Sequence, residues 1–210
     1  MRIIFLFAVF LSVFVFSLVL VCGMPGIPFC SVVSANSLVL GSGAIHLGLT
    51  SAAFFFLWKP DLKAMLKKLG FPGSLKNTII YSIGGLAAVF TALLILSFIF
   101  FMAGLNDQQK VLDKISGLPF YILVFAVVFA PLSEELFFRG LLVPRIGIFG
   151  SSLLFGVSHL TYGSIAEIAG VIVVGIILAV IFKRSKSITP CILIHIIYNG
   201  VSLAVMKLLT

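Results

Sequence analysis

The sequence predicts an all-α membrane protein, a polytopic bundle of about seven transmembrane helices. Apolar residues make up 61% of the 210 residues, charged residues make up 10%, and the mean hydropathy is +1.31. Soluble domains are about half apolar and a quarter charged, so this composition excludes them. The apolar residues run on without the alternation of a transmembrane β-barrel. We therefore expect residues 1–210 to form a single integral membrane domain in a lipid bilayer.

Apolar runs of about 20 residues, enough for a helix to cross a bilayer, recur along the chain. The first has only Arg2 before it and is longer than a signal-peptide core, so we expect a retained helix. The segment 59–77 interrupts the runs with basic residues, prolines and glycines, which predicts a loop with a short basic interfacial helix. The fifth run is too short to cross alone and is expected to be tilted or re-entrant. The predicted spans are 3–22, 37–58, 78–104, 118–142, 149–162, 165–183 and 189–208.

The basic residues predict the orientation of the chain. The formal net charge is +8, and lysines and arginines cluster in two short segments beside apolar runs, 59–76 and 183–186. Such clusters are typical of cytoplasmic loops and do not indicate a nucleic-acid partner. With both clusters in the cytoplasm, the N-terminus is cytoplasmic and the C-terminus lies outside.

Three ionisable residues interrupt the fourth predicted span. Glu134, Glu135 and Arg139 would each cost on the order of 2.5–3.5 kcal/mol near the centre of a transmembrane helix, so a functional site is the default interpretation. On an α-helix, Glu135 and Arg139 lie four residues and about 40° apart, so they can neutralise each other. Glu134 faces another direction and has no counter-charge in its own helix. A poorly solvated, unpaired carboxylate is suited to act as a general base.

Polar residues of the following spans fall at a similar depth. At about 1.5 Å of rise per residue, Glu134 and His159 both lie roughly 18 Å from the turn between their helices. Counted from the turn before the last span, His195 and Asn199 lie roughly 12 and 18 Å deep, on one helix face. We predict that these four side chains meet in one cavity in the cytoplasmic half of the membrane. His46 belongs to no such pattern, and we expect it to be a packing residue.

The three motifs Glu-Glu-x-x-x-Arg, Phe-x-x-x-His and His-x-x-x-Asn follow one another in successive apolar segments. Together they resemble the motifs of the CAAX protease and bacteriocin-processing (CPBP, or Abi) family of intramembrane endopeptidases. The resemblance covers about residues 118–205, which we expect to form the core. The roles it implies are water activation by Glu134 assisted by His159, stabilisation of the oxyanion by His195 and Asn199, and structural support by Glu135 and Arg139.

The resemblance implies a hydrolase that cleaves a membrane-associated peptide or a prenylated protein from a cavity open to the cytoplasm. The sequence leaves the substrate open between a prenylated C-terminal tail and a leader peptide or bacteriocin. Two alternatives to a peptidase also stay open. One is a small proton-coupled transporter with a Glu/His relay. The sequence has no detectable inverted repeat, which counts against a transporter. The other is a noncatalytic membrane scaffold that binds a partner through the basic loop 59–76.

Two mechanisms of water activation are compatible with these residues, one with a metal ion and one without. The His-Glu-x-x-His motif of many zinc proteases is absent. His159 and His195 are candidate zinc ligands together with Glu134, but Glu135 would then have to serve as the base while paired with Arg139. This accounting favours direct activation by Glu134 with no required cofactor, and zinc remains the alternative.

Overall fold

The computed structural model describes residues 35–57, 61–71, 73–105 and 107–209. These residues form helices and contain no strand, which confirms the all-α fold class. Four helical stretches among them are long and apolar enough to cross a membrane. The first predicted span, 3–22, lies outside the described residues.

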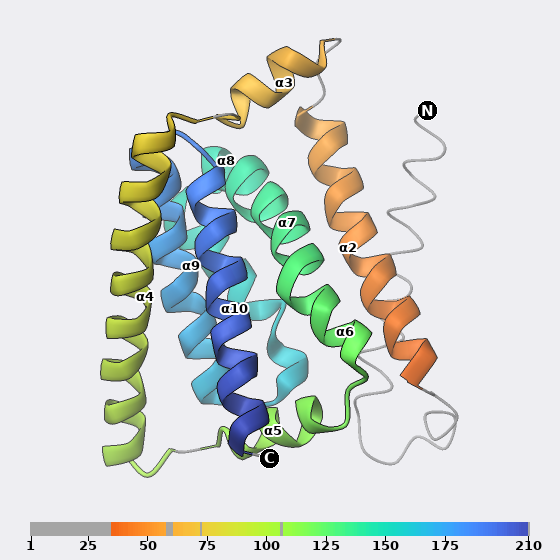
Figure 1. The fold of residues 1–210 in the computed structure, drawn as a ribbon, viewed down its shortest axis with the longest axis vertical. Coiled ribbons are helices and arrows are strands. Elements are labelled where there is room, and N and C mark those ends of the chain that lie inside the picture. The colour runs from red at the N-terminus through yellow and green to blue at the C-terminus, as the bar shows by residue number, and fades with distance from the viewer. Residues whose placement is uncertain (1–34, 58–60, 72, 106, 210) are drawn as a thin grey trace.

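The first half of the described chain crosses the bundle twice (Figure 1). Helix α4 (Leu75–Met102) confirms the predicted span 78–104, and helix α2 (Ala35–Leu57) forms at the predicted span 37–58, where its apolar part is shorter. Between them, α3 (Leu62–Lys68) lies at the upper end of the view and confirms the predicted short basic helix. Helix α5 (Gln109–Ser116) lies at the opposite end, in the segment between the predicted spans 78–104 and 118–142, for which no helix was predicted.

The predicted span 118–142 is a composite helix rather than a regular α-helix. It contains two π-helical segments, whose wider turns are frequently found at functional sites. Pro131 is the second residue after the first of them and has no N–H to donate, so a regular hydrogen-bond ladder cannot run through this point. The segments in order are α6 (Phe120–Val124), η2 (Phe125–Phe129), α7 (Ala130–Glu134) and η3 (Glu135–Leu142).

The chain then reverses at Gly147, within α8 (Val143–Val157). Gly147 has φ 78° and ψ −178°, a conformation that glycine adopts readily and other residues rarely do. Beyond this break α8 packs back against η3, and Ser151 Oγ donates a hydrogen bond to the Phe138 carbonyl at 2.8 Å. The predicted turn near residue 147 is confirmed. The predicted span 149–162 is shorter as a helix, because α8 ends at Val157 and a single 3₁₀ turn, η4 (Leu160–Tyr162), follows.

Helices α9 (Ile165–Ser185) and α10 (Thr189–Leu209) complete the bundle and confirm the last two predicted spans. Glycines allow helices to approach closely, as is common in membranes. A Cβ atom on Gly156 of α8 would lie 2.3 Å from Cγ1 of Ile172 in α9. A Cβ atom on Gly85 of α4 would lie 2.4 Å from Cδ1 of Ile194 in α10. These two contacts hold α8, α4 and the C-terminal pair in fixed registers.

The two basic segments lie at the same end of the bundle (Figure 1). The Ile188 N–H donates to the Leu69 carbonyl at 3.1 Å, and Ser187 Oγ donates to the Gly70 carbonyl at 2.8 Å. Gly70 has φ +74°, and a Cβ atom there would lie 2.1 Å from the Lys186 carbonyl oxygen, so only glycine fits. The cytoplasmic location of this end stays a prediction from the positive-inside rule.

Lysine side chains hold α5 against the opposite end. Lys110 Nζ donates to the Gly163 carbonyl at 3.2 Å, and Lys114 Nζ donates to the Thr161 carbonyl. Lys207, near the end of α10, donates to the Ser116 carbonyl at 2.9 Å. The acceptors of Lys110 and Lys114 are distant in the sequence, so a local pattern does not reveal why this segment is ordered.

Asp107 joins the same end to the start of α9. Its carboxylate accepts hydrogen bonds from Ser164 Oγ at 2.7 Å, from the Ile165 N–H at 2.8 Å and from the Ala166 N–H at 3.2 Å. The hydrogen bond from Ser164, followed by that from Ile165, lowers the pKa of Asp107 to about 2. A carboxylate at this position also complements the positive end of the helix dipole.

We predict that Asp107→Asn lowers the melting temperature at neutral pH, because the charge that accepts these hydrogen bonds is lost. Since folding lowers the pKa from 3.8 to about 2, the stabilisation is fully present above pH 3.8 and is lost as the pH falls through 2. The measurement is thermal unfolding in detergent across this range. The control is Asp113→Asn, an exposed carboxylate that accepts a hydrogen bond from the Gln109 side chain. A difference from wild type that persists unchanged to pH 2 would contradict the prediction.

Candidate active site

A buried ion pair lies at the centre of the bundle. Arg139 Nη1 donates to Glu135 Oε1 at 2.8 Å, and the two side chains are 1% and 0% exposed. The predicted pairing of these two residues is therefore present. The guanidinium also donates to the Gly175 carbonyl at 3.4 Å and lies 4.4 Å from the centroid of the Phe155 ring, a cation–π contact. Two further helices thus contact the same charge.

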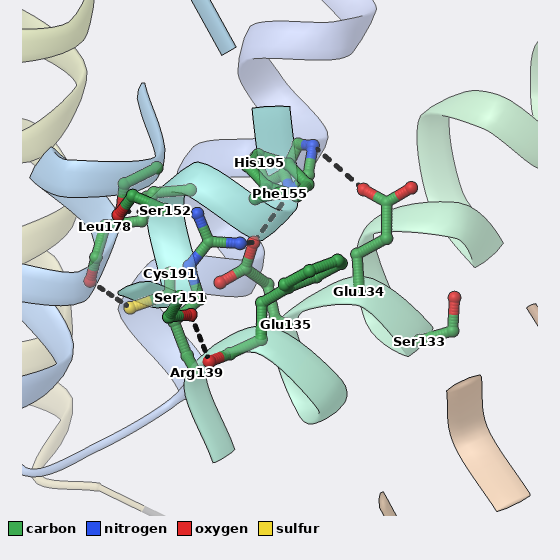
Figure 2. Close-up of polar contacts among 12 residues, drawn as sticks. Ser133, Glu134, Glu135, Arg139, Ser151, Ser152, Phe155, Leu178, Cys191 and His195 are labelled. Carbon is green, nitrogen blue, oxygen red and sulfur yellow. Dashed lines mark hydrogen bonds and ion pairs between the residues drawn. The ribbon is translucent and has the colours of Figure 1, made fainter. Parts of the chain in front are cut away.

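His195 of α10 extends this pair to a second carboxylate (Figure 2). Its Nδ1 lies 2.8 Å from Glu135 Oε1. An ionised carboxylate only accepts hydrogen bonds, so His195 Nδ1 carries the hydrogen and donates it. The other ring nitrogen, Nε2, faces Glu134 Oε2 at 3.6 Å. The ring therefore lies between the two adjacent glutamates.

Glu134 has histidine neighbours on both sides. Besides His195, the Nε2 of His46 lies 3.9 Å from Glu134 Oε1. The Glu134 side chain is 12% exposed, whereas that of Glu135 is 0% exposed, so of the two glutamates Glu134 is the one that water can reach. The expectation that Glu134 lacks a counter-charge holds within its own helix, but other helices supply two imidazoles.

The expectation that His46 is only a packing residue is wrong, because its side chain also makes polar contacts. Its Nδ1 lies 2.6 Å from Ser133 Oγ, and its ring packs against that of Phe125 at a centroid distance of 5.3 Å. Sequence reasoning missed both His46 and Ser133 as neighbours of Glu134. The signal was available for His46, since an ionisable residue in an apolar span is itself a candidate functional residue.

His159 lies beside this cluster and has different partners. Its Nδ1 donates to the Phe155 carbonyl at 2.9 Å, and its ring stacks on Tyr162 at a centroid distance of 5.9 Å. The Phe155 ring contacts both His159 and His195, at centroid distances of 4.9 and 5.8 Å. Within the described residues, no ion-pair contact joins His159 to Glu134. The first and last residues of the Phe-x-x-x-His motif thus both border the site.

Asn199 contacts the composite helix rather than the glutamates. Its Nδ2 donates to the Ala126 carbonyl at 2.9 Å, inside the π-helical segment η2. A second N–H of this amide is left for another acceptor. The predicted convergence is therefore seen directly for Glu134 and His195. His159 and Asn199 instead donate hydrogen bonds to backbone carbonyls.

Two hollows lie on the described part of the bundle, and neither is lined by Glu134. A hollow of about 290 Å³ lies beside α4 and the start of α9, away from Glu134. A second lies between α5 and α10. The larger hollow is lined by Leu94, Ser97, Phe98, Phe100, Phe101, Gln108 and Ala166.

The donor groups do not form a metal site in this structure. Among the described residues, no three His, Cys, Asp or Glu side chains are arranged so that they could hold a metal ion. The candidate ligands His159 and His195 are engaged through Nδ1 with different acceptors, the Phe155 carbonyl and Glu135. We therefore derive no step through a metal.

Comparison with known families gives the class of protein. Residues 116–201 match the sequence model of a family described as type II CAAX prenyl endopeptidase Rce1-like. The match spans the composite helix through most of α10 and contains all six predicted site residues. Over these residues it confirms the resemblance to the CAAX protease and bacteriocin-processing family that was drawn from the motifs. No curated protein and no solved structure shows significant similarity to the chain.

We predict that Glu135→Ala destabilises the protein by about 3–5 kcal/mol, because it leaves Arg139 buried without its carboxylate. The measurement is the free energy of unfolding in detergent. The matched control is the double variant Glu135→Leu with Arg139→Met, which removes both charges and should be clearly more stable than Glu135→Ala. A double variant less stable than Glu135→Ala would show that the buried pair is not what the single change disrupts.

Proposed function

We propose that the chain is an intramembrane endopeptidase in which Glu134 activates a water molecule to hydrolyse a peptide bond of a membrane-associated substrate. The observation that carries this proposal is the position of the Glu134 carboxylate. It is the partly exposed acid of an adjacent pair, flanked by imidazoles of two other helices, in a segment that matches a family of prenyl endopeptidases. This match also favours a peptidase over a transporter or a scaffold.

The proposed reaction needs one base and a means of stabilising an oxyanion. Glu134 takes a proton from water as the water oxygen attacks the scissile carbonyl carbon. The proton then passes to the amide nitrogen, the C–N bond breaks, and the products are a carboxylic acid and an amine. Donors held in a poorly hydrated site stabilise the developing negative charge more strongly than they would in water.

His195 and Asn199 are the donors we propose for the oxyanion. His195 already donates through Nδ1 to Glu135, so it stabilises an oxyanion only if Nε2 also carries a proton. The Glu135 carboxylate, at 2.8 Å from Nδ1, orients the ring, as the aspartate does in a serine-protease triad. Asn199 has one N–H beyond the one it gives to Ala126. His159 is proposed to assist Glu134 in activating the water molecule.

Glu135 and Arg139 have a supporting role in this proposal. Their ion pair orients the His195 ring and holds η3 against α9 through the Gly175 carbonyl. They are buried and paired, so neither is available to act as the base. Glu134 and Glu135, adjacent in the sequence, are thus assigned different tasks by their surroundings.

The substrate class we propose first is a prenylated protein or peptide with a CAAX-type C-terminal tail, cleaved from the cytoplasmic side. The family description names prenyl endopeptidases, and the segment that carries the site is embedded in apolar helices. A leader peptide or bacteriocin is the second substrate class to test. Both are membrane-associated peptides, so the same purified protein can be assayed with a farnesylated and an unlipidated peptide side by side.

We predict that Glu134→Gln abolishes cleavage of a farnesylated CAAX peptide while the melting temperature changes little. Glutamine keeps the shape of the side chain but cannot accept the proton. The measurement is product release by purified protein in detergent, with Glu167→Gln, an acid in the first turn of α9, as the matched control. Full activity of Glu134→Gln would refute the proposed base.

We also predict that cleavage survives strong zinc chelators, because Glu134 is needed as the base and Glu135 is already paired with Arg139. The measurements are activity after chelation and bound metal by mass spectrometry. Stoichiometric zinc whose removal abolishes cleavage and whose return restores it would overturn this mechanism. His159 and His195 would then be ligands, and Glu135 would become the base.

A further inference from the structure

The three histidines of the chain share one hydrogen-bonding arrangement. In His195 and His159, Nδ1 lies against an oxygen that can only accept, the Glu135 carboxylate at 2.8 Å and the Phe155 carbonyl at 2.9 Å. Nδ1 must therefore carry the hydrogen in both rings. In a neutral ring this leaves Nε2 as an acceptor.

The same tautomer follows for His46 from the partners of Ser133. Ser133 Oγ lies 2.6 Å from His46 Nδ1 and 2.8 Å from the Ala130 carbonyl oxygen. A hydroxyl has one hydrogen, and a carbonyl only accepts, so Ser133 donates to Ala130. For the shorter contact to be a hydrogen bond, His46 Nδ1–H must donate to Ser133. His46 Nε2 is then an acceptor that points toward Glu134.

An acceptor thus faces a carboxylate oxygen across a gap that suits a bridging water. The distance of 3.9 Å from His46 Nε2 to Glu134 Oε1 is too long for a direct hydrogen bond. A water that donates one hydrogen to Glu134 and the other to His46 satisfies both acceptors. The opposite carboxylate oxygen, Oε2, faces His195 at 3.6 Å. The two oxygens of Glu134 are therefore directed to different helices, Oε1 to α2 and Oε2 to α10.

We propose that His46 is a water-positioning residue, whose Nε2 accepts the second hydrogen of the water that Glu134 activates. The inference rests on the proposed function. As the water attacks, its O–H bond toward Glu134 breaks and a C–O bond forms, while the hydrogen facing His46 stays on the oxygen. Holding both hydrogens fixes the direction of the oxygen lone pair that attacks the carbonyl. His46 lies in α2, outside the segment 116–201 that matches the family.

A merely structural role would make His46 a tie between α2 and α7 through Ser133, and three substitutions separate the roles. In His46→Asn the amide nitrogen can still donate to Ser133, but no atom replaces Nε2. In His46→Gln the longer side chain places an amide oxygen toward the position of Nε2. Ser133→Ala removes the tie and leaves the imidazole in place.

With the farnesylated CAAX peptide as probe, we expect His46→Asn to lower kcat roughly 10²-fold with KM within about twofold of wild type. His46→Gln should recover most of this loss. Ser133→Ala should lower the melting temperature while kcat stays close to that of wild type. Wild-type kcat in His46→Asn would overturn the proposal. If Glu134→Gln is inactive in the same assay, the proposed function stands while the role of His46 fails.

A second measurement requires neither a substrate nor a catalytically active variant. Protein labelled with ¹⁵N at histidine gives separate imidazole signals, and the His46→Asn spectrum identifies those of His46. We expect His46 Nδ1 to be protonated and Nε2 unprotonated, and we expect Glu134→Gln to shift the Nε2 signal. A protonated Nε2 with a bare Nδ1, or no response to Glu134→Gln, would overturn the proposal whatever the protein cleaves.

Discussion

The arrangement of the bundle depends on the neutralisation of one buried charge. Neither Arg139 nor Glu135 can lose its partner without a large loss of stability, because the remaining charge would be buried and unpaired in the membrane interior. Each element that touches the pair is held by it: α10 through His195, α9 through the Gly175 carbonyl and α8 through the Phe155 ring. Glu134 precedes this pair by one residue. Its position is therefore fixed by contacts that it does not itself make.

Sequence reasoning predicted the features that follow from lengths and local spacing. The thickness of the hydrocarbon layer sets the length of a span, so the limits of α2, α4, α9 and α10 lay within a few residues of their predicted limits. Spacing along one helix was enough to pair Glu135 with Arg139. Helix α5 was missed because lysines reach carbonyls far away in the sequence, and a pattern within the segment does not contain that information.

The surroundings of Glu134 were beyond local reasoning for a similar reason. A helical wheel assumes regular α-turns, whereas η2 and η3 are wider, and it describes only one helix. The neighbours of Glu134 come from α2 and α10, whose rotation about their own axes the sequence does not give. His46 was therefore overlooked, although its burial in an apolar span carried the same signal as Glu134 itself. The roles of His159 and Asn199 still rest on the family resemblance.

Backbone carbonyls are the acceptors of many hydrogen bonds between the helices. Asn199 donates to Ala126 in η2, Ser151 to Phe138 in η3, and Arg139 to Gly175 in α9. A side-chain acceptor disappears with a single substitution, but a carbonyl remains whichever residue occupies its position. Mutational sensitivity should therefore be asymmetric, concentrated at the donor positions, while the acceptor positions tolerate any residue that fits the space. Over many generations, such a bundle can change much of its apolar sequence and still keep the hydrogen bonds that fix the register of its helices.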